Sequence, residues 1–69
     1  MSEQINKLAS NLNRLIFDKD MTWKELAAKS NVSYRTILDI KRKKLNYVHS
    51  NTLDKLAKFL GVTIDELVS

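Results

Sequence analysis

Apolar residues recur every three or four positions over the first part of the chain, which is the spacing of one face of an α-helix. This pattern predicts a helix over residues 3–17. Its apolar positions are Ile5, Leu8, Ala9, Leu12, Leu15 and Ile16. Ile16 and Phe17 are adjacent and cannot both point toward the core. We therefore expect one of the two to be exposed.

Two shorter helices separated by a tight turn are predicted within residues 22–42. Thr22 and Ser33 stand at their starts, where a side-chain hydroxyl can accept a free backbone N–H of the first turn. Glu25 follows Thr22 by three residues and completes a capping box. Asn31 lies at the turn, where a left-handed backbone is expected and Asn tolerates it.

The second of these helices has a narrow inner stripe. Ile37 and Ile40 are three residues apart and share one face. The outward residues are then Tyr34, Arg35, Leu38, Asp39 and Lys41. A short helix followed at a steep angle by another with a polar outer face predicts a helix-turn-helix motif.

The remaining chain predicts a connection of six to eight residues followed by two helices. The first starts near Ser50 or Asn51 and ends at Gly61, with apolar positions Leu53, Leu56, Ala57 and Leu60. Thr63 and Glu66 form a second capping box. It opens a last short helix that we expect to bury Ile64 and Leu67. The expected fold is all-α, with five helices in one domain over residues 1–69.

Composition excludes several classes of protein. There is no Cys for a disulfide or thiolate metal site, and the apolar runs are too short for a membrane span. The sequence has no paired catalytic carboxylates, no His–nucleophile arrangement and no glycine-rich phosphate loop, so we do not expect an enzyme. His49 is the single histidine, and we expect neither a metal site nor a cofactor. The polar start is unlike a signal peptide, and we expect a cytoplasmic protein without a membrane or small-molecule partner.

The positive charge is concentrated in the predicted helix-turn-helix. The chain carries a net charge of +4, whereas residues 24–44 alone have seven basic and two acidic side chains. Basic charge gathered in one segment is typical of proteins that bind polyanions. On charge alone, a solvated lysine-rich surface is an equally good interpretation.

Two blocks of the sequence, TWKELAAKSNVSYRTILDI and LDKLAKFLGVTIDELV, resemble the bacteriophage repressor and Cro-like (XRE-type) helix-turn-helix family. The resemblance covers about residues 8–68 and includes both caps and the core positions. It implies a five-helix, lambda-repressor-like DNA-binding domain with its helix-turn-helix at helices 2 and 3. It also implies a sequence-specific transcriptional regulator of the Cro or repressor type. Such a protein places helix 3 in the major groove of operator DNA, usually as a dimer.

The family pattern assigns roles to individual positions of this chain. The base-contact candidates are Tyr34, Arg35, Leu38 and Asp39. The phosphate-contact candidates are Trp23, Lys24, Ser33, Thr36, Arg42, Lys43 and Lys44. The candidates for a weak homodimer interface are Tyr47, Val48, Ile64 and Val68. The implied partner is double-stranded DNA.

Several positions depart from the family pattern. Trp23 stands where relatives often have Gln, and Asn31 stands where they have a turn Gly. Ile16 and Lys41 occupy positions where relatives often have an Arg–Glu pair that joins helix 1 to helix 3. That ion pair is therefore absent on both sides.

Two questions stay open at the level of sequence. Asp39 can accept a hydrogen bond from cytosine N4, or it can pair with Arg35 one helical turn away and orient it. The domain can also serve as a protein-interaction module, such as an antirepressor or antitoxin-like protein, using Trp23, Phe17 and Leu38. One exposed patch of these residues together with Ile16 favours that function. Inward packing of Trp23 and Ile16, together with basic residues that share one face, favours DNA binding.

Overall fold

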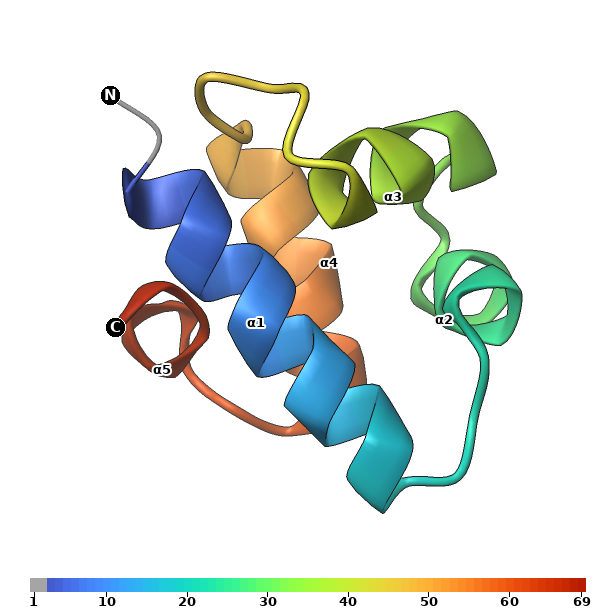
Figure 1. Ribbon diagram of the computed structural model, residues 1–69. Coiled ribbons are helices and arrows are strands. Elements are labelled where there is room, and N and C mark those ends of the chain that lie inside the picture. Colours follow the sequence, from blue (N-terminus) through green and yellow to red (C-terminus); the bar gives the residue numbers. More distant parts are fainter. Residues whose placement is uncertain (1–2) are drawn as a thin grey trace.

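The computed structural model describes residues 3–69. This part of the chain contains five helices and no strand (Figure 1). The all-α, five-helix prediction is confirmed. The helices are α1 (Glu3–Asp18), α2 (Trp23–Ser30), α3 (Tyr34–Lys41), α4 (Ser50–Leu60) and α5 (Ile64–Val68). The predicted boundaries agree with these to within one or two residues.

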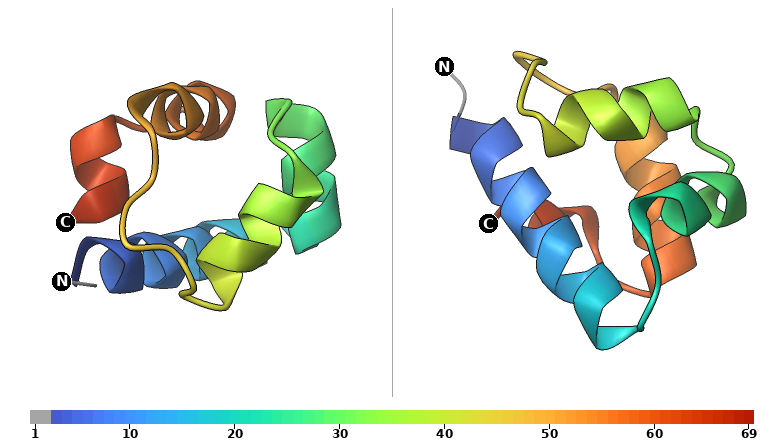
Figure 2. Two further views of the ribbon diagram at one scale, coloured as in Figure 1. Left: turned by 90° about the horizontal axis from the view of Figure 1, so that it is seen from above. Right: turned by 45° about the vertical axis from the view of Figure 1, so that its right-hand side comes forward.

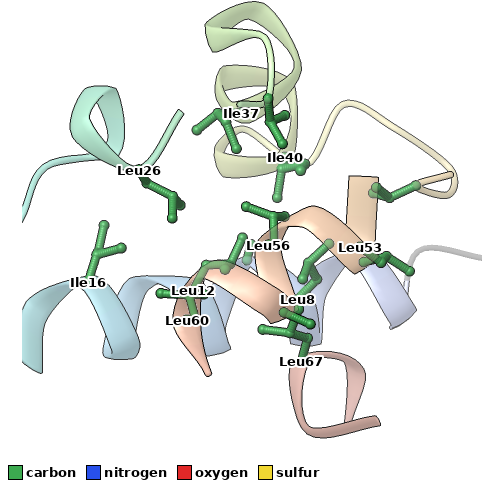
Figure 3. Packing of buried hydrophobic residues seen from close by; sticks show 14 of the residues in the cluster. Leu8, Leu12, Ile16, Leu26, Ile37, Ile40, Leu53, Leu56, Leu60 and Leu67 are labelled. Carbon is green, nitrogen blue, oxygen red and sulfur yellow. The ribbon is translucent and has the colours of Figure 1, made fainter. Parts of the chain in front are cut away.

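Every helix contributes to one hydrophobic core. The side chains without any exposed surface are Ile5, Leu8, Leu12, Leu26, Ile37, Ile40, Leu56 and Leu67. Figure 3 shows most of them converging from different helices on the space between α1, α3 and α4. A 69-residue chain has little surface to bury, so a core shared by all elements is what stabilises it.

The helix-turn-helix lies on one side of this core and α5 on the other. Figure 1 shows α2 almost end-on while α3 runs across the view, so the two helices cross steeply. The two further views agree that α2 and α5 are at opposite sides of the molecule (Figure 2). α3 packs against both α1 and α2. The core therefore holds one face of α3 and leaves the opposite face outward.

At the C-terminal end of α1, one of the adjacent residues Ile16 and Phe17 is buried and the other is exposed. Ile16 is 4% exposed and belongs to the core, whereas Phe17 is 82% exposed. This confirms that only one of the two points inward. Figure 1 places the C-terminal end of α1 away from α3.

The C-terminal part confirms most of the predicted signals and corrects one. Gly61 ends α4 in the left-handed conformation, with φ 72°. Thr63 and Glu66 make the expected capping box at α5. Leu67 is fully buried, but Ile64 retains 36% of its surface. The predicted burial of Ile64 is wrong, because a five-residue helix turns only its Leu67 side fully onto α1.

Asn11 is a buried polar residue that the sequence reasoning missed. Its Nδ2 donates to the carbonyl oxygens of Glu66, at 3.1 Å, and Leu67, at 2.7 Å. These carbonyls belong to the last turn of α5 and have no partner within that helix. Asn11 thus caps α5 from α1. A polar residue three positions after Leu8 and four before Leu15, inside the apolar stripe, was the available signal.

Candidate nucleic-acid interface

The start of α2 is fixed by its capping box. Thr22 Oγ1 accepts a hydrogen bond from the Glu25 N–H at 3.1 Å, and Glu25 Oε1 accepts one from the Thr22 N–H at 2.8 Å. These two bonds satisfy backbone donors that no preceding turn can satisfy. They place Trp23 and Lys24 at the first two positions of α2.

The turn between α2 and α3 depends on Asn31. Its φ of 62° and ψ of 36° are left-handed, and its N–H donates to the carbonyl of Ala27. Val32 follows and is buried. Asn31 therefore adopts the left-handed conformation that was expected at the turn. This turn sets the steep angle between α2 and α3.

Ser33 occupies the N-cap position of α3, but its hydroxyl makes no capping hydrogen bond. This part of the cap prediction is wrong. The backbone at Ser33 is non-helical, with φ −54° and ψ 135°, and it still starts the helix, because the Ile37 N–H donates to the Ser33 carbonyl at 3.0 Å. The hydroxyl is exposed and thus available to a ligand.

The outward face of α3 carries the four base-contact candidates. Ile37 and Ile40 are fully buried, and Tyr34 is 42% exposed. Arg35 is exposed as well, whereas Leu38 and Asp39 are half-buried. These side chains lie on the face of α3 opposite Ile37 and Ile40, which point into the core.

Arg35 and Asp39 do not form an ion pair. Among the side chains of residues 4–69 the structure contains one salt bridge, between Lys58 and Asp54. The interpretation of Asp39 as an intramolecular partner of Arg35 is therefore not supported. Both side chains are available for contacts outside the chain.

Trp23 is half-buried and packs against the core. The Nζ atom of Lys41 lies 5.8 Å from the centre of its ring, which is within cation–π range. This contact joins the start of α2 to the end of α3. Ile16 is apolar and buried, so Lys41 cannot form with it the ion pair that the resemblance leads one to expect at these two positions.

Basic side chains continue past the end of α3. Arg42, Lys43 and Lys44 are all exposed, as is Lys24 on α2. Lys43 has a left-handed φ of 59°, and the Lys44 N–H donates to the Asp39 carbonyl at 2.9 Å. The chain therefore turns sharply here and keeps these cations next to the outward face of α3.

Thr36 lies on the side of α3 that faces the following connection. It is half-buried and lines a cavity of about 360 Å³ together with Tyr47, His49 and Thr52. A phosphate that contacts Thr36 would therefore lie next to the connection between α3 and α4.

The candidate dimer residues are not equally accessible. Tyr47 is 61% exposed, and its ring meets the His49 ring edge-on at 5.3 Å. Ile64 is partly exposed and Val68 is half-buried against the core. Val48 is 7% exposed within a single chain. Its assignment as an interface residue is corrected, because it belongs to the monomer core.

The apolar residues considered for protein binding do not form one patch. Ile16 is in the core, and Trp23 packs inward beneath Lys41. Leu38 is half-buried on α3, and Phe17 lies at the distant end of α1. The inward packing of Trp23 and Ile16, which is one of the two features expected of a DNA-binding domain, is therefore present.

Residues 4–69, whose side chains the structure describes, hold no group of three or more His, Asp or Glu side chains arranged to bind a metal ion. None of their helices combines the length and the apolar character needed to cross a membrane.

The comparison with protein families identifies a domain of known type. The model of the Cro/C1-type helix-turn-helix DNA-binding domain matches residues 11–69, which include all of α2 to α5 and half of α1. No curated protein and no solved structure matches the chain.

Proposed function

Because the chain belongs to the Cro/C1-type helix-turn-helix DNA-binding domains, we propose that it is a sequence-specific transcriptional regulator that places α3 in the major groove of operator DNA. The observation that carries the proposal is the division of α3 into two faces. The core takes Ile37 and Ile40, and four side chains able to contact bases face outward.

Each outward side chain has a chemical role in this proposal. Arg35 donates two hydrogen bonds to guanine O6 and N7, a contact that discriminates by about 1–3 kcal/mol. Tyr34 and Leu38 contact a base edge or a thymine methyl. Asp39, which is free of Arg35 in the structure, accepts from cytosine N4 and repels a phosphate placed near it.

Phosphate contacts surround these base contacts. Arg42, Lys43 and Lys44 follow α3, while Trp23, Lys24, Ser33 and Thr36 belong to the motif itself. Such contacts orient the protein and supply affinity for any DNA sequence, with a steep dependence on salt.

The first experiment is selection of bound sequences from random duplex DNA at two salt concentrations, followed by Arg35→Ala on the selected site. We expect recovery of a half-site or palindrome, and a loss of specific affinity of about tenfold or more for the variant, with little change on random DNA. Arg14→Ala is the matched control, because Arg14 is an exposed arginine on α1. An equal loss for Arg35→Ala on both DNAs would remove Arg35 from the base-reading set.

We propose further that operator binding is by a weak homodimer through Tyr47, Ile64 and Val68. The exposed surface of Tyr47 and Ile64 supports this set. Sedimentation equilibrium of the free protein and of its complex with the selected site tests it. A complex containing one protein chain per palindrome would contradict the dimer.

One observation favours a second function, that of a protein-interaction module of the antirepressor or antitoxin-like kind. Phe17 leaves 82% of its surface exposed at the end of α1. If wild-type protein binds no duplex even at low salt, this function takes precedence, and Phe17→Ser should then abolish binding to the protein partner.

A further inference from the structure

A cavity lies between the helix-turn-helix and α1. Its volume is about 340 Å³, and its lining residues are Ala9, Ser10, Asn13, Trp23, Lys41 and Lys43. It thus brings together the middle of α1, the start of α2 and the end of α3. Ser10, Asn13 and Lys41 have no role in the proposed function.

The polar side chains that line the cavity are hydrogen-bond donors. Ser10, Asn13, Trp23 and the two lysines can all donate hydrogen bonds, and no carboxylate of residues 4–69 lines the cavity. The structure gives none of these side chains a hydrogen-bond partner within residues 3–69. Several hydrogen-bond donors and two ammonium groups around one concave site attract an anion with several acceptor oxygens.

Lys41 is held in place without being neutralised. Its ammonium group stands 5.8 Å from the centre of the Trp23 ring, and the salt bridge found in residues 3–69 involves neither Lys41 nor Lys43. A cation–π contact orients a cation but leaves its charge. An ion pair at the same place would have cancelled the charge that the cavity now carries.

We propose that this cavity binds a phosphate group, with Lys41 and Lys43 supplying charge and Asn13 and Ser10 supplying hydrogen bonds from α1. The phosphate can belong to a DNA backbone or to a free phosphate ion. The backbone is favoured because both helices of the motif line the cavity. In that form the inference rests on the proposed function, and α1 holds the strand that flanks the groove occupied by α3.

Trp23 is the single tryptophan of the chain, so its fluorescence reports on the cavity. Wild type, Lys41→Gln, Asn13→Ala and Lys58→Gln are each titrated with random duplex DNA over a salt series, and separately with inorganic phosphate. Lys58→Gln is the matched control, since it removes the same charge from an exposed site on α4. Circular dichroism verifies that every variant is folded, which is expected because the three substituted residues are exposed.

For a DNA phosphate we expect DNA to change Trp23 fluorescence. Lys41→Gln should lose about fivefold or more in affinity and lower the salt slope by about one, and Lys58→Gln should do neither. Asn13→Ala should lose affinity without changing the slope. For a free anion, inorganic phosphate alone should change the fluorescence of wild type and not of Lys41→Gln.

The two proposals fail in different ways. If wild type binds DNA, phosphate has no effect, and both cavity variants match Lys58→Gln, the cavity inference is overturned and DNA recognition stands. If DNA does not bind but phosphate is bound through Lys41, the cavity inference holds and the proposed function fails. If neither probe changes Trp23 fluorescence, the cavity inference is overturned.

Discussion

Asn11→Ala removes the hydrogen bonds that tie the last turn of α5 to α1. The amide is 9% exposed and donates to two carbonyls, at 3.1 and 2.7 Å, that lie more than fifty residues away in sequence. No other side chain in residues 3–69 donates to these two oxygens. The substitution therefore leaves the end of α5 without its partner.

The expected cost follows from three contributions. Each lost hydrogen bond contributes about 1 kcal/mol to the free energy of unfolding, which gives about 2 kcal/mol for the two. Alanine recovers about 0.5 kcal/mol because it is the better helix former. The net loss is about 1.5 kcal/mol, and for a domain of this size this lowers Tm by about 6–12 °C.

Thermal and urea denaturation followed by circular dichroism measure this loss. Asn13→Ala is the control, because it makes the same change two residues along α1 at an exposed asparagine whose side chain makes no hydrogen bond within residues 4–69. We expect this control to be stabilised slightly by helix propensity. Asn11→Asp retains the shape but not the donor, and should be at least as unstable as Asn11→Ala at neutral pH. Equal stability of Asn11→Ala and Asn13→Ala would refute the capping role.

Three further predictions concern the motif. Thr22→Ala breaks a capping box and should lower the free energy of unfolding by about 1 kcal/mol. Ser33→Ala breaks no capping hydrogen bond and should change the free energy of unfolding by less than about 0.5 kcal/mol in the same urea titrations. Asn31→Ala should destabilise by about 1 kcal/mol while Asn31→Gly should not, since φ is 62° there; similar Tm values for the two would contradict this reading of the turn. Lys43→Ala with Lys44→Ala should reduce the salt slope of binding to any duplex by about two, and an unchanged slope would exclude both lysines from phosphate contact.

Local patterns in the sequence predicted most of the fold. The period of three to four placed the five helices, and the T-x-x-E spacing identified both capping boxes, at Thr22 and Thr63. These features depend on residues within one or two turns of each other. The interactions that form them lie within a short stretch of chain, so the sequence of that stretch is enough to predict them.

The features that the sequence missed depend on long-range packing. Val48 lies in a connection without periodicity, and it is buried only because the connection folds over the core. Asn11 meets α5 across more than fifty residues. The Arg35–Asp39 pair had suitable helical spacing, but spacing permits a pair without requiring it, since an exposed ion pair contributes little energy. Ser33 likewise had a suitable position for a cap that its hydroxyl does not make.

The departures from the family pattern change the charge at one place in particular. At the two positions where the resemblance implies an Arg–Glu pair, this chain has the buried Ile16 and Lys41, which lies over Trp23 and forms no salt bridge with the side chains of residues 4–69. An additional uncompensated cation strengthens binding to every phosphate backbone equally and discriminates between no sequences. In the proposed complex, discrimination comes from the outward face of α3, where Asp39, which forms no salt bridge within residues 4–69, is unfavourable against most of a DNA surface and favourable against cytosine. We therefore expect Asp39→Asn to increase affinity for random DNA and to reduce the ratio of specific to non-specific affinity, measured on the selected site. A loss of affinity on both DNAs would show that Asp39 supports the fold of α3 and does not read the site.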